Sequence, residues 1–127
     1  MPSALSFTID ASRPVAIVRY HEQPTFAEWS EIMDRLLSDA HCNPQLGVIL
    51  DRRYVFFPAD EAYIQQMVRY LDSGRAAGKL ARCAIVVTDM GSYGMGRLAE
   101  QITNLKGSIQ TFRNLHDAET WLAGEKP

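Results

Sequence analysis

The chain has 127 residues, of which 46% are hydrophobic and 22% are charged, and this size suits one domain with a single core. Its formal net charge of −2 gives no field that would gather a nucleic-acid backbone or anionic lipid, so nucleic acid is not an expected partner. No apolar run approaches the roughly 18 residues of a membrane-spanning helix. We therefore expect one soluble, cytoplasmic domain over residues 1–127 with no membrane span.

The cysteines and histidines do not predict a metal or redox centre. Cys42 and Cys83 lack C-x-x-C spacing and are too few for a disulfide framework, so both are expected to be free thiols, with Cys83 inside a strand. His21, His41 and His116 do not show a paired spacing such as H-x-x-x-H. The sequence therefore predicts no metal and no cofactor.

The amino-terminal part predicts a hairpin and then a helix. The runs SALSFTID (3–10) and RPVAIVRY (13–20) alternate apolar and polar residues or are rich in β-branched ones, as in two antiparallel strands. Thr25 and Glu28 then have the spacing of a capping box, in which each side chain satisfies a backbone donor at a helix start. Pro44 is expected to end this helix near HCNP.

The rest of the chain alternates strands with helices. Two runs are apolar on consecutive residues, which is typical of strands covered on both faces and hence of a parallel sheet. Glycines are expected to end the helices, because they adopt the left-handed conformation that a helix terminus often needs. The expected strands are LGVILD (46–51), ARCAIVVTD (81–89) and, as an edge strand, SIQTFRN (108–114). Three helices are expected: one that ends at Gly74, one over 93–105 that is followed by Gly107, and one over 115–124 with Asn114 as its cap.

The resulting order, β-β-α-β-α-β-α-β-α, predicts an α/β fold with a mixed, mostly parallel sheet, an amino-terminal hairpin and four helices. A phosphoacceptor receiver domain would need an acidic pair after its first strand and a lysine at the end of its last strand. Here Asp10 precedes a hairpin and Lys106 precedes the last strand. A dinucleotide-binding fold would need G-x-G-x-x-G after its first strand, whereas these glycines run G-x-x-G-x-G after the fourth.

Three features together resemble a known family. They are the hairpin before the β-α alternation, the segment GVILDRRYVFFPADEAYIQQM (47–67), in which a strand ends in Asp before a loop and a helix, and the segment SYGMGR (92–97). Over nearly its whole length the chain resembles the small stand-alone bacterial proteins related to STAS domains, whose fold is that of the SpoIIAA-like anti-sigma-factor antagonists. The resemblance implies a regulatory or protein-interaction module. Related members include transporter tails and lipid-binding proteins.

The resemblance also implies a place for a phosphorylation switch, which this chain lacks. In the antagonists, a serine at the start of the second helix is phosphorylated, and the added charge breaks the complex. Aligned on Asp51, the present chain has Ala59, Asp60 and Glu61 at that place, so no hydroxyl remains. The two carboxylates are expected either to cap the helix or to form a permanently charged docking surface.

The segment TDMGSYGMGR (88–97) is the other candidate site. Backbone donors at a helix start bind anions, and a serine, glycines and an arginine lie here. Tight packing of Gly94 and Gly96 on the sheet is the competing interpretation. Because ligands of open α/β sheets bind beyond the carboxyl ends of strands, we expect the candidates to gather there. The candidate ligand-binding or docking residues are Asp51, Arg52, Arg53, Phe57, Asp60, Glu61, Asp89, Ser92, Tyr93, Gly94 and Arg97.

No catalytic set is predicted: Ser92 lacks a G-x-S-x-G elbow and has no histidine beside it in the sequence. Three hypotheses remain. The first is a non-enzymatic STAS-like module that docks a protein partner, or a second copy as a homodimer, through the second helix and the loops after Asp51 and Asp89. The second is a carrier for a small anionic or amphipathic ligand at these loops, with an apolar pocket near YVFF (54–57). The third is a small enzyme using Asp51, Asp89 or Tyr93 as acid or base.

Overall fold

A computed structural model describes residues 4–10, 12–42, 45–56, 58–76 and 78–124. The order of its elements confirms the predicted alternation. Within the described residues these elements are β1 (Leu5–Asp10), β2 (Val15–Tyr20), α1 (Phe26–Leu37), β3 (Gly47–Asp51), α2 (Glu61–Ala76), β4 (Cys83–Val86), α3 (Met90–Ile102), β5 (Ile109–Phe112) and α4 (Leu115–Leu122).

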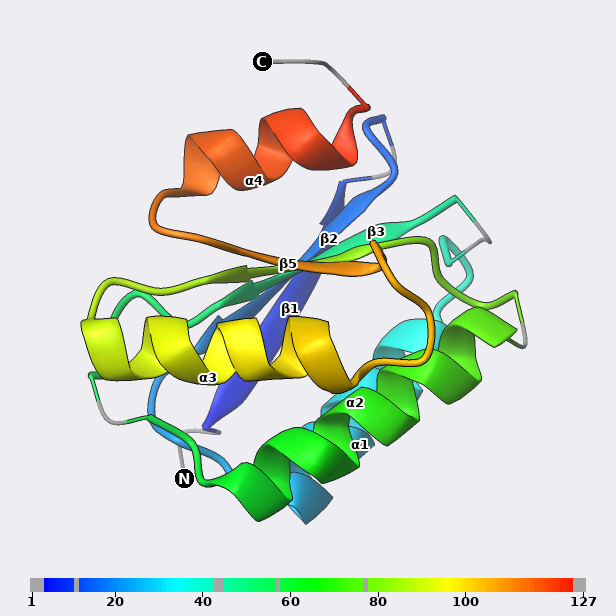
Figure 1. The fold of residues 1–127 in the computed structure, drawn as a ribbon. Coiled ribbons are helices and arrows are strands. Elements are labelled where there is room, and N and C mark those ends of the chain that lie inside the picture. Colours follow the sequence, from blue (N-terminus) through cyan, green and yellow to red (C-terminus); the bar gives the residue numbers. More distant parts are fainter. Residues whose placement is uncertain (1–3, 11, 43–44, 57, 77, 125–127) are drawn as a thin grey trace.

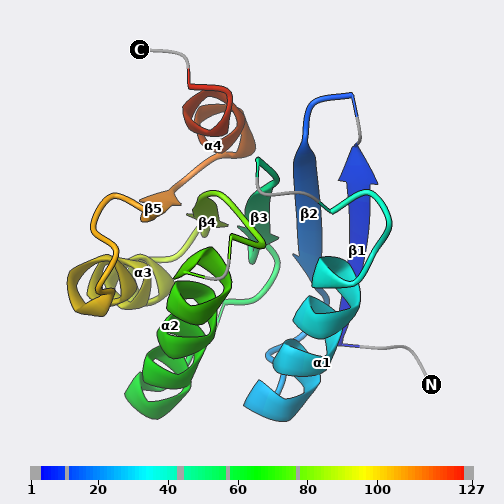
Figure 2. The ribbon, with the colours of Figure 1, turned by 90° about the vertical axis from the view of Figure 1, so that its right-hand side faces the viewer.

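The five strands form one twisted sheet in the order β1-β2-β3-β4-β5 (Figures 1 and 2). β1 pairs antiparallel with β2 as the predicted hairpin, and β2 to β5 are parallel. The mixed, mostly parallel α/β sheet is therefore confirmed. Among the described residues, no helix is long and apolar enough to cross a membrane.

The helices divide unequally between the two faces of the sheet. α1, α2 and α3 pack on one face, and α4 lies alone on the other, over β3 to β5 (Figure 2). The larger core lies under the three helices and includes the fully buried Trp29, Met33, Leu50 and Leu71. A smaller core lies under α4, around Ala118. Because α4 contacts β3, β4 and β5, the outer face of β1 and β2 is covered by no helix of the described residues.

Local sequence signals fix several helix ends as expected. Thr25 and Glu28 form the predicted capping box at the start of α1. Asn114 caps α4, because its side chain accepts a hydrogen bond from the amide of Asp117 at 2.8 Å. Gly124 follows α4 with a φ of 75°, the left-handed conformation expected of a terminal glycine.

Other predicted helix ends are wrong. α1 ends at Leu37, several residues before Pro44, which lies outside the described residues. α2 continues through Gly74 to Ala76. α3 begins at Met90 rather than residue 93, because the side chain of Asp89 caps it, and it ends at Ile102. Ile102 is 37% exposed instead of facing inward.

The two glycines of SYGMGR have different environments. A Cβ atom on Gly96 would lie 2.4 Å from Thr111 Oγ1 on β5, so α3 packs against the sheet at a distance that only glycine permits. A Cβ atom on Gly94 would meet nothing within 4 Å. The packing interpretation is therefore confirmed at Gly96 and wrong at Gly94.

These glycines give a matched pair of variants. Gly96→Ala should lower the free energy of unfolding by about 1–3 kcal/mol, because its methyl group overpacks the helix–sheet contact. Gly94→Ala should raise it by up to about 1 kcal/mol, because alanine favours an exposed helical position over glycine. Urea unfolding of both proteins measures the difference, and equal effects would contradict this account of the packing.

Candidate functional site

The parallel strands bring several predicted site residues to one edge of the sheet. Asp51 ends β3, Arg53 lies in the loop that follows, and Thr88 and Asp89 follow β4. The two loops are joined, because Thr88 Oγ1 donates a hydrogen bond to the carbonyl of Arg53 at 2.9 Å. These residues therefore meet at the carboxyl edge, as the fold predicts.

Asp51 and Arg53 form an ion pair within this edge. Asp51 is 3% exposed, and Arg53 donates from Nε to Oδ1 and from Nη2 to Oδ2, both at 2.9 Å. Burial of the carboxyl opposes its ionisation, but the hydrogen bonds from Arg53 outweigh this and hold the pKa of Asp51 below its usual value. The guanidinium of Arg53 is thus bound by the last residue of the preceding strand, β3.

Arg52 points into the protein instead of toward a ligand at the surface. It is 7% exposed, and its guanidinium lies over the ring of Tyr20, 4.8 Å from the ring centroid. Burial raises the pKa of Tyr20 to about 12 and also raises the pKa of Tyr63, so both phenols are neutral. Arg52, Tyr63 and Ser92 line a cavity of about 20 Å³, which is the size of one water molecule.

The glycine-containing segment is the beginning of a helix and not a loop. Asp89 Oδ2 accepts a hydrogen bond from the amide of Ser92 at 2.9 Å. Burial opposes the ionisation of Asp89, but the bonds from Ser92 outweigh it and lower its pKa. A carboxylate of the chain therefore already occupies the position at this helix terminus where an external anion was expected.

The remaining candidate residues of this segment, Tyr93, Gly94 and Arg97, do not form one site. Tyr93 is half-buried with the guanidinium of Arg113 4.6 Å from its ring centroid. Arg97 lies on the next turns of α3 and pairs with Glu100 at 3.1 Å. Gly94 is exposed on the same helix. The structure thus places Arg97 about 10 Å along α3 from Met90, given a rise of about 1.5 Å per residue.

The two acidic residues at the start of α2, Asp60 and Glu61, have separate roles. Asp60 Oδ1 accepts a hydrogen bond from the amide of Tyr63 at 2.8 Å, which caps α2. Glu61 is the exposed first residue of α2, and Gln65 Nε2 donates to it at 3.4 Å. Phe57 lies outside the described residues.

Three large apolar side chains project from the carboxyl edge. Tyr54 is 69% exposed, Phe56 is 62% exposed and Met90 is 80% exposed, whereas Val55 between the first two is buried. We call Tyr54, Phe56 and Met90 the edge patch. The loop of Tyr54 and Phe56 lies against the start of α3, since a Cβ atom on Gly91 would be 3.4 Å from Pro58. The sequence indicated the two aromatic residues, and it missed Met90 because the helix start was placed three residues too late.

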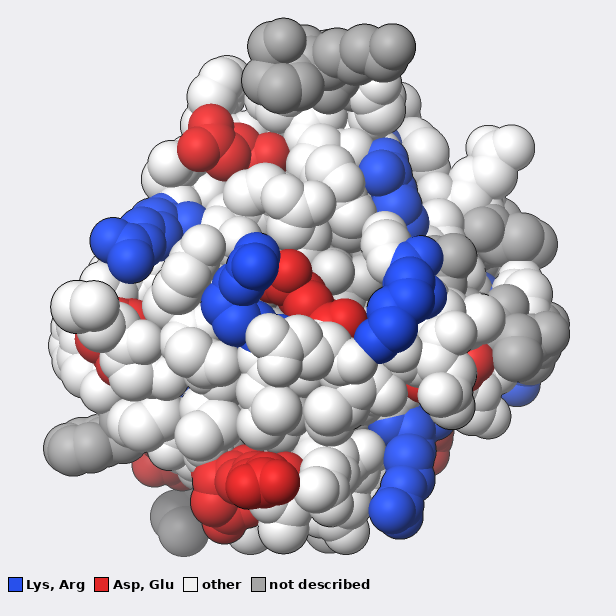
Figure 3. All heavy atoms as spheres, viewed as in Figure 1, with Lys and Arg blue, Asp and Glu red and all other residues white. Residues whose placement is uncertain are grey.

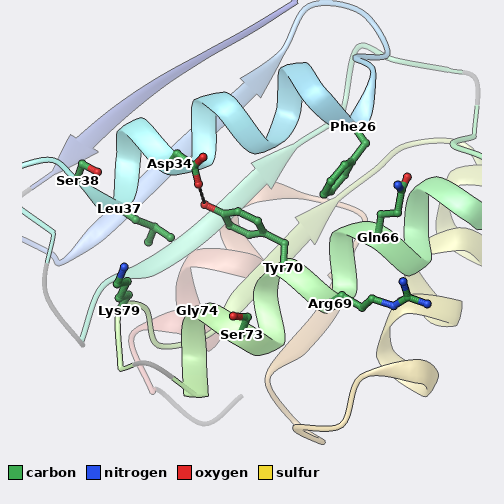
Figure 4. Close-up of a pocket in the computed structure, with 10 residues that line it drawn as sticks. All are labelled: Phe26, Asp34, Leu37, Ser38, Gln66, Arg69, Tyr70, Ser73, Gly74 and Lys79. Carbon is green, nitrogen blue, oxygen red and sulfur yellow. Dashed lines mark hydrogen bonds between the residues drawn. The ribbon is translucent and has the colours of Figure 1, made fainter.

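A groove between α1 and α2 was not predicted (Figure 4). Its volume is about 600 Å³, within the roughly 300–1,000 Å³ typical of small-molecule sites. Tyr70 of α2 points across it and donates a hydrogen bond to Asp34 Oδ1 of α1 at 2.5 Å. The lining residues are Phe26, Asp34, Leu37, Ser38, Gln66, Arg69, Tyr70, Ser73, Gly74 and Lys79.

Two cations of this groove have no partner among the described residues. The side chains of Arg69 and Lys79 make no hydrogen bond or ion pair to any residue that the structure describes. Elsewhere, basic and acidic side chains are mixed, and Figure 3 shows no broad patch of one sign on the viewed face. The described residues contain no cluster of three or more His, Cys, Asp or Glu that could hold a metal ion.

Comparison with known protein families, with curated proteins and with solved structures finds no match for this chain. The resemblance to STAS domains therefore stays a prediction from the sequence.

The pair between Asp51 and Arg53 predicts a pH-dependent contribution to stability. Arg53→Gln leaves a buried carboxylate without its main partner, so the free energy of unfolding at pH 7 should fall by about 1–3 kcal/mol. Because pairing depresses the folded-state pKa of Asp51, its contribution is present above the unfolded-state pKa and is lost as the pH falls through the folded-state pKa. Urea unfolding at pH 7 and at about pH 2 should show the loss at neutral pH only.

Arg97→Gln is the matched control for this variant. Its ion pair with Glu100 is solvent-exposed on the arginine side, so its removal should change the free energy of unfolding by less than about 0.5 kcal/mol. If Arg53→Gln lost as little stability as Arg97→Gln, or lost the same amount at both pH values, the Asp51 pair would not have the role described above.

Proposed function

We propose that this protein is a non-enzymatic, STAS-like regulatory module that docks a protein partner through the edge patch. The observation that carries the proposal is the joint exposure of Tyr54, Phe56 and Met90 at one edge. Single exposed apolar residues are common on protein surfaces, but exposed large apolar residues that gather at one place are typical of interaction sites. The partner fitting this surface is a folded protein with an apolar pocket that accepts the two rings.

The state of the acid and base candidates supports a non-enzymatic role. Asp51 is held in an ion pair, Asp89 caps a helix, and Tyr93 lies beneath Arg113. These three residues line neither of two cavities described at this edge, one of about 20 Å³ beside Ser92 and one of about 400 Å³ between Thr25 and Asp60. The hypothesis of a small enzyme therefore has less support than docking.

The loop at the start of α2 supports a partner interaction that is always available. In the resembling antagonists, a phosphate on a serine disrupts docking, and this chain has no hydroxyl among Ala59, Asp60 and Glu61. Asp60 is already bound to the backbone of α2. Control of this module would thus come from the supply of its partner rather than from phosphorylation at this position.

Removing the two rings tests the docking proposal. A partner retained by the wild-type protein from the cells that produce it should be lost by the double variant Tyr54→Ser/Phe56→Ser. With the purified partner, calorimetry should show the affinity falling at least tenfold, because central aromatic residues commonly contribute more than about 1.4 kcal/mol each. The double variant should keep the melting temperature of the wild type, since both rings are exposed.

Ile102→Ser is the control for general surface hydrophobicity. Ile102 is also an exposed large apolar residue, but it lies at the opposite end of α3 from Met90. The Ile102→Ser variant should bind the partner with the affinity of the wild type. Equal binding by the double variant and the wild type would refute docking through the edge patch.

A carrier of small anions is the second candidate function, and the α1–α2 groove favours it. The sequence placed this function at the carboxyl edge, where one cavity holds about 20 Å³ and another, of about 400 Å³, is lined by no described arginine or lysine. The groove holds about 600 Å³ and is lined by both. Arg69 and Lys79, which have no partner in the part of the chain that the structure describes, would bind an anionic group. Phe26, Leu37 and the Tyr70 ring would contact an apolar one.

Native mass spectrometry of the freshly purified protein tests the carrier function. A bound ligand would appear as extra mass that denaturation removes, and Arg69→Ala/Lys79→Ala should abolish it. Arg35→Ala is the control, because Arg35 is an exposed cation of α1 that does not line the groove. Protein free of extra mass, or extra mass that survives in the double variant, would count against a ligand in this groove.

A further inference from the structure

The two edges of the sheet differ in how they are protected. An edge strand carries backbone groups that pair readily with another strand, and proteins protect such edges with inward-pointing charges, covering elements or prolines. β5 was the strand predicted to be exposed at an edge, and the structure confirms its edge position. β1 forms the opposite edge, and no helix or strand of the described chain lies beyond it (Figure 2).

β5 is protected by Glu100 of α3. The amide of Thr111 points away from β4 and donates a hydrogen bond to Glu100 Oε2 at 2.9 Å. The Glu100 side chain is only 17% exposed, so it is a largely buried charge directed at the edge. α3 packs alongside β5 and limits the approach of another strand.

β1 has no comparable protection among the described residues. The bond from the amide of His21 to the carbonyl of Ala4, at 2.8 Å, fixes which residues of β1 bond to β2. By the alternation of an antiparallel ladder, the amides and carbonyls of Phe7 and Ile9 point away from β2. No hydrogen bond from another described residue reaches them. The strand LSFTID also contains no proline or lysine.

We propose that β1 is the interface of a homodimer, in which two copies pair antiparallel about a twofold axis at Thr8. In this register Phe7 of each copy exchanges two backbone hydrogen bonds with Ile9 of the other copy. The outward-pointing amides and carbonyls of both residues are therefore all hydrogen-bonded in each copy. Thr8 then lies directly opposite Thr8 of the second copy, a favourable cross-strand pair. The five-stranded sheet of each copy becomes half of one continuous sheet.

The side chains of β1 are compatible with pairing to themselves. On the helix-covered face, the half-buried Phe7 lies beside Ile9 of the other copy, which extends both apolar cores. On the outer face, Asp10 lies opposite Ser6, so like charges do not face each other. A twofold arrangement of this kind closes the assembly at two copies, because each copy uses the same edge.

Charged substitutions at the twofold axis test both the interface and its register. The wild-type protein should sediment at twice 14.3 kDa. Thr8→Lys and Thr8→Glu should each be monomeric, because each places two like charges directly opposite each other. An equimolar mixture of the two variants should recover the doubled mass as a heterodimer, because lysine then faces glutamate. Recovery on mixing requires that both variants are folded.

Gln110→Lys is the control for Thr8→Lys. It places the same positive charge at an exposed position on the outer face of β5, away from β1, and should leave the dimer intact. As a measurement on the unaltered chain, amide hydrogen exchange at Phe7 and Ile9 should slow as the protein concentration rises. A wild-type protein that stays monomeric, a Thr8→Lys variant that remains dimeric, or exchange at Phe7 and Ile9 that is independent of concentration would overturn the proposal.

Discussion

The right-handed crossover that connects parallel strands determines where the candidate sites of this protein lie. Each of β3, β4 and β5 is added beside the preceding strand in the same direction, so a crossover of one hand places α1, α2 and α3 on the same face. All four parallel strands also end at the same edge. The groove between α1 and α2 and the gathering of Asp51, Asp89 and their loops follow from this constraint, whereas β1 lies at the sheet edge because it pairs only with β2, as a hairpin.

The carboxyl edge combines rigid polar contacts with exposed apolar side chains. The backbone of the loop after β3 is held by the Asp51–Arg53 pair and by the bond from Thr88. Such contacts reduce the conformational freedom that a loop must lose on binding. Tyr54 and Phe56 therefore project from an ordered loop, and less entropy is lost when a partner covers them. The charges of this edge position the proposed docking surface and do not themselves form it.

Local signals in the sequence sufficed for the order of elements, the parallel sheet and several caps, because those depend on periodicity and on residues three or four apart. Thr25 with Glu28, and Asn114 with Asp117, are such cases. The structure of the glycine segment 88–97 was harder to predict. A single acidic residue, Asp89, determines where α3 begins, and its carboxylate occupies the candidate anion site at the start of that helix.

Features that join distant parts of the chain could not be read from the sequence. Tyr70 and Asp34 meet across the groove although 36 positions separate them, and no local pattern marks either residue. The inward direction of Arg52 depends on the ring of Tyr20, which belongs to another strand. Which edge is protected also depends on a tertiary contact, because Glu100 reaches Thr111 only after α3 packs on β5.

The two proposed surfaces lie on different parts of the molecule and would act together. The dimer interface uses the backbone edge of β1, whereas the edge patch belongs to the loop after β3 and to the start of α3. Pairing through β1 would leave the edge patch uncovered and would present two copies of it, related by a twofold axis. A partner with two acceptor pockets at the matching distance would then bind with far higher affinity than one pocket gives by itself. Once the first pocket is occupied, the second binding step is intramolecular and takes place at a high effective concentration. Dimerisation would thus be the step that converts a small, weak docking patch into a selective regulator of partners that are themselves paired.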